Sequence, residues 1–137
     1  MGRLSIKQRI LKTSDINRRK ELALNWHQAW AGKMKRELSW SIEELETLDL
    51  QQIFWRLRFI KAETEKHFAA LPNVLDSLDI SGDKYRNTAS QFISLIDGIM
   101  HKLNLERNSR NTKLLLQNAY FEYRNFSDEL VSVIKNR

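Results

Sequence analysis

The sequence predicts an all-α protein, a bundle of five to six helices in a single domain. Residues that break helices are scarce, because the chain of 137 residues holds one proline and four glycines. It also lacks the β-branched runs and closely spaced turn residues that strands require. Leucine, lysine, glutamate and arginine, which favour helices, are abundant. We expect one domain over residues 1–137, in which residues 1–13 form either a short helix or a flexible arm.

The first long helix is predicted to begin at Ser14 or Asp15, either of which can serve as its N-cap, and to end near Leu38. Apolar residues recur along one side of it at helical spacing, namely Ile16, Ala23, Trp26, Trp30, Met34 and Leu38. The residues Ser-Ile-Glu-Glu at positions 41–44 fit a capping box. They predict a further short helix or turn, with Asp49 as a second possible cap.

A second long helix is predicted over about Leu50–Leu71. It should stop at Pro72, because proline lacks the N–H group that would continue the helix. This helix has two apolar sides. One side carries Leu50, Ile53, Phe54, Leu57, Phe68 and Leu71. The nearly opposite side carries Trp55, Phe59 and Ala62. Such a helix lies either at the centre of a bundle or against a partner. Residues 72–82 form the clearest predicted loop.

Two further helices are predicted, one over about Asp83–Leu103 and one from about Thr112, joined by a turn over residues 104–111. The first of them has the cleanest apolar stripe in the chain: Tyr85, Ala89, Phe92, Ile96, Ile99, Met100 and Leu103. In the last helix, Ser127 is expected to form a cap or a kink. Apolar residues surround that helix almost completely, which disfavours its use as the recognition helix of a helix-turn-helix motif.

Charge is unevenly distributed along the chain, which has a formal net charge of +6 and a pI near 9.7. Residues 1–38 hold ten basic and three acidic residues, residues 39–80 hold four basic and eight acidic, and residues 81–137 hold nine basic and six acidic. Segregation by sign is typical of a surface that binds the phosphate backbone of a nucleic acid. The alternative, that these charges only keep a bundle soluble, stays open.

We expect the basic side chains to gather on one exterior surface and to contact phosphate groups. The candidates are Arg18, Arg19, Lys20, Lys33, Lys35, Arg36, Lys102, Arg107, Arg110 and Lys113, with Arg56 and Arg58 in reserve. Arginine beside an exposed aromatic ring can stack on single-stranded bases. The alternative is that the neighbouring aromatics belong to the core and the basic side chains extend away from it. The apolar surplus predicts subunit contacts at Trp55, Phe59, Tyr120 and Tyr123.

The chemistry of most enzymes is missing from the sequence. It has no cysteine, no phosphate-binding glycine loop and no catalytic serine or zinc motif. Glu63 with His67, and Asp97 with His101, have the spacing of a metal pair, but the paired pattern of di-metal bundles is absent. We expect a non-enzyme with no cofactor and no metal. The first residues lack the apolar stretch of a secretory signal, so the expected location is the cytoplasm, without membrane contact.

A basic, cysteine-free, helical and non-catalytic chain of this size resembles the small subunits of CRISPR effector complexes. The resemblance lies in length, helix pattern and charge, across the whole chain. It implies a five- or six-helix bundle, present in several copies along a ribonucleoprotein. There the subunit would hold other protein subunits together and steady a target duplex or a displaced DNA strand through basic residues. The expected function is therefore a non-catalytic subunit that binds nucleic-acid backbone with little sequence preference.

Two other functions remain open. The first is a helical protein-interaction module, such as an adaptor, immunity or inhibitor protein, whose basic face meets an acidic protein. The second is a helical nuclease, which would depend on His67 or His101.

Overall fold

The structure, a computed structural model, describes residues 5–47, 49–105 and 110–137. Within these ranges the regular elements are all helical, which confirms the all-α prediction. They are α1 (Ile6–Leu11), α2 (Ile16–Thr47), α3 (Leu50–Asp76), the single-turn 3-10 helix η1 (Asp83–Tyr85), α4 (Thr88–Leu105) and α5 (Arg110–Lys135). The first thirteen residues therefore include a short helix, one of the two forms expected for them.

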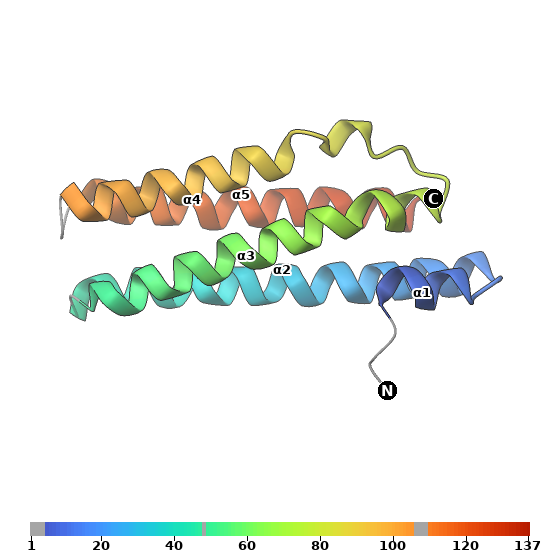
Figure 1. Ribbon diagram of the computed structural model, residues 1–137, viewed down its shortest axis with the longest axis horizontal. Helices are drawn as coiled ribbons and strands as arrows, with labels where there is room; N and C mark the ends of the chain where they lie inside the picture. Colours follow the sequence, from blue (N-terminus) through green and yellow to red (C-terminus); the bar gives the residue numbers. More distant parts are fainter. Residues whose placement is uncertain (1–4, 48, 106–109) are drawn as a thin grey trace.

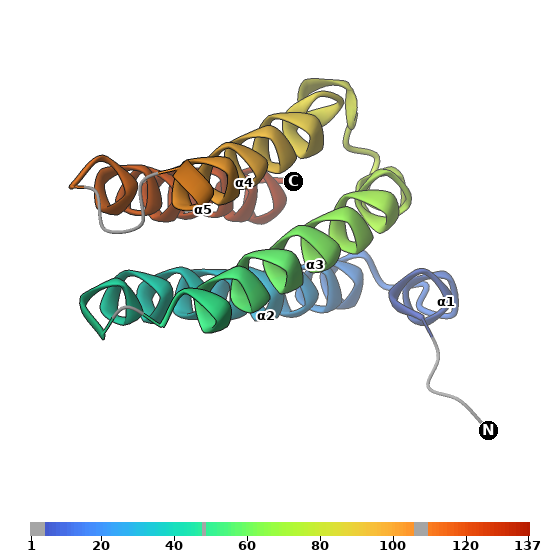
Figure 2. The same cartoon turned by 60° about the vertical axis from the view of Figure 1, so that its left-hand side comes forward.

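The four long helices run up, down, up and down, so that each is antiparallel to the next (Figure 1). Helix α2 packs against α3 and α5, and α4 packs against the same two helices, which closes a four-helix bundle. The short α1 contacts α2 and α3 and lies beside the end where α2 begins (Figure 2). Helix α3 therefore has α2 on one flank and α4 on the other, while α5 lies diagonally across the bundle from it.

The core is continuous along the whole bundle and draws on every long helix. Its largest fully buried side chains are Ile10, Met34, Leu38, Ile53, Leu57, Ile60, Leu71, Leu75, Leu78, Ile96, Ile99 and Tyr123. The apolar stripe predicted for α4 is confirmed at its centre, because Phe92, Ile96, Ile99 and Leu103 are all buried. Burial of such stripes, more than local propensity, makes helices of this length stable.

Helix α2 is longer than predicted, because it continues from Leu38 to Thr47 without a break. The capping box predicted at 41–44 is wrong. Ser41 is buried inside the helix, and its hydroxyl donates a hydrogen bond to the carbonyl oxygen of Glu37 one turn earlier. Leu38, Ser41 and Leu45 extend the buried stripe at helical spacing, so tertiary burial overrides the capping signal. The caps predicted at Asp15 and Asp49 are confirmed, since each accepts a backbone hydrogen bond from the first turn that follows it.

Pro72 does not end α3, which continues to Asp76. Pro72 is exposed and stands one turn before the end, where buried Val74 and Leu75 anchor the last turn in the core. The helix then closes in a Schellman motif. The N–H of Ile80 donates to the carbonyl of Leu75 and that of Asp79 donates to the carbonyl of Asp76, with Asp79 in the left-handed region at φ 57°.

The remaining helix boundaries lie closer to the predicted ones. Residues 83–85 form η1 instead of the first turn of α4, which begins at Thr88. Helix α5 begins at Arg110, and Ser127 neither caps nor ends it, because the helix runs on to Lys135. Of the turn predicted over residues 104–111, positions 106–109 lie outside the described residues.

Two arginines hold the end of α3 in place. The guanidinium of Arg19 donates to the carbonyl oxygens of Thr13 and Ser77, and that of Arg137 donates to the carbonyl oxygen of Leu78. Carbonyl groups at a helix C-terminus lack partners within the helix and carry partial negative charge, so cations stabilise them. These two basic side chains therefore tie the start of α2 and the end of α5 to the end of α3.

Replacing Asp79 with glycine should raise the free energy of unfolding by about 0.5–1 kcal/mol, because glycine adopts a positive φ without steric cost. Chemical denaturation followed by circular dichroism measures this. Asp128→Gly is the matched control, since an exposed position within α5 should lose about 1 kcal/mol on the same change. A lower stability for Asp79→Gly would show that the ion pair between Asp79 and Arg137 matters more than the backbone.

Candidate functional site

Exposed and half-buried aromatic and cationic side chains lie where α2 and α3 face outward. We call this surface the α2–α3 face and define it by Trp26, Lys33, Trp40, Trp55, Arg58, Phe59, Glu63 and Lys66. Trp55 is 65% exposed and Trp40 is 43% exposed, whereas tryptophan is usually well buried. The second apolar side predicted for α3 is thus real, and no described residue of the chain covers its most exposed member, Trp55.

Cations are interleaved with these rings. The ammonium group of Lys33 lies 5.9 Å from the ring centre of Phe59, which joins α2 to α3 across the surface. Trp26, Lys33, Glu63 and Lys66 border a shallow pocket of about 240 Å³ between the two helices. Lys66 approaches Glu63 at 3.8 Å, a weak pair exposed to solvent. Arg58 is exposed one turn from Trp55 and has no polar contact with a described residue.

Arg56 has a different role from the one predicted. Its Nη1 lies 2.9 Å from a carboxylate oxygen of Glu37, its Nη2 lies 2.7 Å from Glu44, and its guanidinium covers Trp40 at 4.9 Å from the ring centre. All three charged groups are largely screened from water. Hydrogen bonding to Glu44 raises the pKa of Arg56 above its ordinary value. Arg56 therefore joins α2 to α3, and its ion pairs with Glu37 and Glu44 disfavour the predicted phosphate contact.

Beneath this surface lies a buried aromatic cluster centred on His67. The imidazole of His67 is stacked between two indoles, with ring centres 4.1 Å from Trp26 and 4.0 Å from Trp30. Phe68 and Phe126 meet Trp30 edge to face. The cluster connects α2, α3 and α5. The surface tryptophan Trp26 is thus the outer layer of a stack that reaches into the core.

The two buried histidines bond to each other. Nδ1 of His27 lies 2.9 Å from Nε2 of His67, so one ring donates to the other. Burial lowers the pKa of His67 to about 2 and that of His27 to about 4, the latter opposed in part by the backbone of Ser127. Both rings are therefore neutral at physiological pH, and one of them donates its N–H group to the unprotonated nitrogen of the other. This pair was not predicted from the sequence. The signal was present, because His27 lies on the same side of α2 as Trp30 and Met34 by helical spacing.

The predicted phosphate contacts do not gather on one surface. Arg18 pairs with Glu21, Arg19 binds carbonyl oxygens, Lys20 donates to the carbonyl of Lys135, and Lys113 pairs with Glu46. Lys33 and Lys35 lie about 160° apart around α2, so they face different sides of the bundle. Lys102 is half-buried in the last turn of α4. Arg107 and the side chain of Arg110 lie outside the described residues. Four of the predicted cations are exposed, and all of them belong to α2 or α3: Arg18, Lys33, Arg36 and Arg58.

Only some of the predicted subunit contacts lie at the surface of the bundle. Trp55 is exposed and Phe59 half-buried, as a contact surface requires. Tyr123, however, is fully buried, and its hydroxyl lies 2.8 Å from that of Thr64, so its assignment as a subunit contact is wrong. Tyr120 is half-buried against the core. The exposed apolar residues of α5 are instead Leu114 and Phe121. A sequence crowded with apolar residues does not reveal which side of α5 faces inward.

The two carboxylate–histidine pairs are not brought together. His67 is enclosed by indoles, and Asp97 pairs with Lys61 on the surface. Among the described residues there is no group of three or more histidine and carboxylate side chains placed to hold a metal ion. Within the same residues, no helix is both long enough and apolar enough to span a membrane.

Comparison of this chain with protein-family models, with curated proteins and with solved structures gives no match.

Acid should destabilise the fold through the histidine pair. Both imidazoles have pKa values in the folded state below the ordinary 6.5, so the unfolded chain binds more protons. The stabilisation that the neutral pair provides is fully present above pH 6.5. It is lost progressively as the pH falls below 6.5, down to the folded-state pKa of about 4 for His27 and about 2 for His67. The free energy of unfolding should decrease by roughly 4 kcal/mol between pH 7.5 and pH 5, about half of it from each histidine. Denaturation measured at a series of pH values tests this.

The variant His67→Gln should lose about half of that pH dependence, because one of the two titrating groups is removed. His101→Gln, which alters an exposed histidine of α4, is the control and should retain it. A wild-type stability that is constant from pH 7.5 to pH 5 would contradict the neutral buried pair.

Proposed function

We propose that this protein is a non-catalytic helical binding module that docks onto an acidic partner protein through the α2–α3 face. The observation that carries the proposal is the exposure of Trp55 beside Arg58, a cation that has no ion pair with a described residue. Tryptophan and arginine are the residues most often found at the energetic centres of protein interfaces. A large apolar ring left in water has no benefit for folding, and a partner would gain by covering it.

The mixture of charges on this face favours a protein over a polyanion. Glu63 lies among the cations, and Glu37 and Glu44 surround Arg56 next to Trp40. Carboxylates at these positions would repel a continuous phosphate backbone. A folded acidic protein can place its carboxylates opposite Lys33, Arg58 and Lys66 and avoid the glutamates, which gives both affinity and specificity.

A nucleic-acid subunit, as expected from the sequence, is the second candidate function. It is favoured by the same pair of residues, because a base can stack on the open ring of Trp55 while Arg58 meets its phosphate. On this proposal binding would involve a single strand of DNA or RNA and few phosphates. A role as a small subunit of a CRISPR effector complex would be a special case of it.

The double variant Trp55→Ala with Arg58→Glu should abolish partner binding, with a loss of affinity of at least about thirtyfold, as expected for an interface centre. Both side chains are exposed, so the variant should keep its helical content and its denaturation midpoint. The measurement is affinity capture with the tagged protein from nuclease-treated extract of its own cells, followed by titration of the captured protein.

The matched control is Phe121→Ala with Arg124→Glu, because it removes an exposed aromatic ring and a neighbouring arginine on α5, where Arg124 lies over the ring of Phe121. It should bind like the wild type. Equal loss of binding in both variants would remove the α2–α3 face as the site.

One titration distinguishes the two candidate functions. A labelled single strand of 20 nucleotides, DNA or RNA, should not change the tryptophan fluorescence of the wild type at 50 mM salt if the partner is a protein. Quenching of Trp55 by the strand, with an affinity that falls steeply as salt rises, would favour the nucleic-acid function instead.

A further inference from the structure

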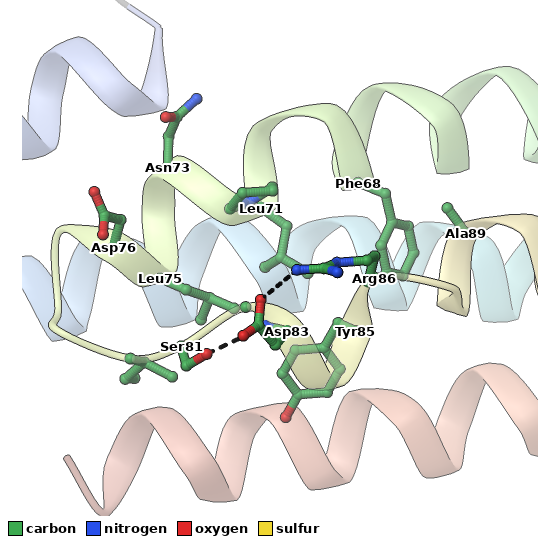
Figure 3. A pocket seen from close by; sticks show the side chains of 13 residues that line it. Phe68, Leu71, Asn73, Leu75, Asp76, Ser81, Asp83, Tyr85, Arg86 and Ala89 are labelled. Carbon is green, nitrogen blue, oxygen red and sulfur yellow. Dashed lines mark hydrogen bonds and ion pairs between the residues drawn. The ribbon is translucent and has the colours of Figure 1, made fainter.

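A second site lies at the other end of α3, in a pocket between its last two turns, the segment 77–82 and η1 (Figure 3). The pocket has a volume of about 580 Å³, which is in the range of pockets that bind small molecules. Its inner wall is apolar and is formed by Phe68, Leu71, Leu75, Ile80, Tyr85 and Ala89. Several of these side chains belong to the core, so the wall is rigid.

The mouth of the pocket is polar and acidic. Asn73 and Asp76 lie on its α3 side, and Asp83 and Arg86 lie on its η1 side (Figure 3). Residues 72–83 hold three aspartates and no lysine or arginine, in a chain whose net charge is +6. The carboxylate of Asp76 is exposed and has no hydrogen bond or ion pair with a described residue. The mouth therefore holds two carboxylates, those of Asp76 and Asp83, against the single cation Arg86.

Arg86 already places one cation in this mouth. Its Nη2 lies 2.7 Å from Oδ1 of Asp83, and in Figure 3 its side chain extends in front of the pocket. Both partners are largely exposed, at 73% and 81% of their side-chain surface. An ion pair this exposed contributes little to the free energy of folding. A bound cation can therefore replace the guanidinium beside Asp83 with little loss of free energy.

We propose that this pocket binds a small apolar amine, with its hydrocarbon part against the inner wall and its ammonium group at the mouth, beside the carboxylate of Asp83 and on the side of the pocket that Asp76 borders. The apolar wall supplies most of the affinity, at about 0.8 kcal/mol for each buried methylene group. The carboxylates select the charge of the head group. A carboxylic acid of the same shape would meet two carboxylates and a guanidinium already paired, so it is disfavoured. This site is separate from the α2–α3 face and does not depend on the function proposed for it.

Isothermal titration calorimetry of the full chain with octylamine, octanol and octanoate tests the proposal. Octylamine should bind with a stoichiometry of one. Octanol should bind about threefold or more weakly, because it lacks the charge, and octanoate should bind weakest. Butylamine should also bind more weakly than octylamine, because it buries fewer methylene groups.

Substitutions at the pocket test whether octylamine binds there. Asp76→Asn should weaken octylamine binding by about threefold or more without affecting octanol, and Arg86→Gln should strengthen octylamine binding by removing the competing cation. Ala89→Leu should weaken both ligands, because its larger side chain occupies part of the pocket. The matched control is Asp128→Asn, which removes an exposed carboxylate of α5 and should leave binding unchanged.

Three results would overturn the proposal. The first is octylamine binding no tighter than octanoate binding. The second is an equal loss of affinity in Asp76→Asn and Asp128→Asn. The third is binding of a short leucine–lysine peptide in the absence of any octylamine binding, which would identify the pocket as a peptide site. All of the charge variants alter exposed side chains, so a failure to fold would not obscure the outcome.

Discussion

The hydrogen bond between His27 and His67 joins α2 to α3 in the middle of the bundle, and the packing around it depends on both rings being neutral. Trp26 and Trp30 enclose His67 on its two faces, and Phe126 brings α5 against His27 and Trp30. A charged imidazole at this position would have to be removed from water, and no carboxylate among the described residues forms an ion pair with either ring. The low pKa values of both histidines follow from that enclosure.

The buried aromatic cluster determines which side chains of α3 lie on the surface. Once the inward face of α3 is occupied by His67, Phe68 and the aliphatic core, Trp55 and Phe59 can only point away from the bundle. Two of the predicted phosphate contacts, in contrast, are used by the fold itself. Arg19 closes the end of α3, and Arg56 joins two glutamates to Trp40. The proposed binding surface therefore rests on the exposed cations of α2 and α3 that have no ion pair with a described residue, and not on the net charge of the chain.

Much of the fold could be predicted from the sequence, because apolar stripes such as Phe92, Ile96, Ile99 and Leu103 depend only on helical spacing. The ends of α2 and α3 could not, since burial of Leu45 and Val74 outweighs the local signals at Ser41 and Pro72. At the candidate site, the outward face of Trp55 was visible as a second apolar side of α3. The partners of Arg19, Arg56 and the two histidines were not, because each contact joins residues far apart in the chain.

The most direct test of this account is the nuclear magnetic resonance titration of the imidazole nitrogens of the three histidines. At pH 5.5 the rings of His27 and His67 should both be neutral, with one nitrogen protonated in each and a scalar coupling across the bond between them. His101, which is exposed, serves as the internal reference in the same spectrum. A ring of His27 or His67 that takes up its proton near pH 6.5 in the folded protein would contradict the account.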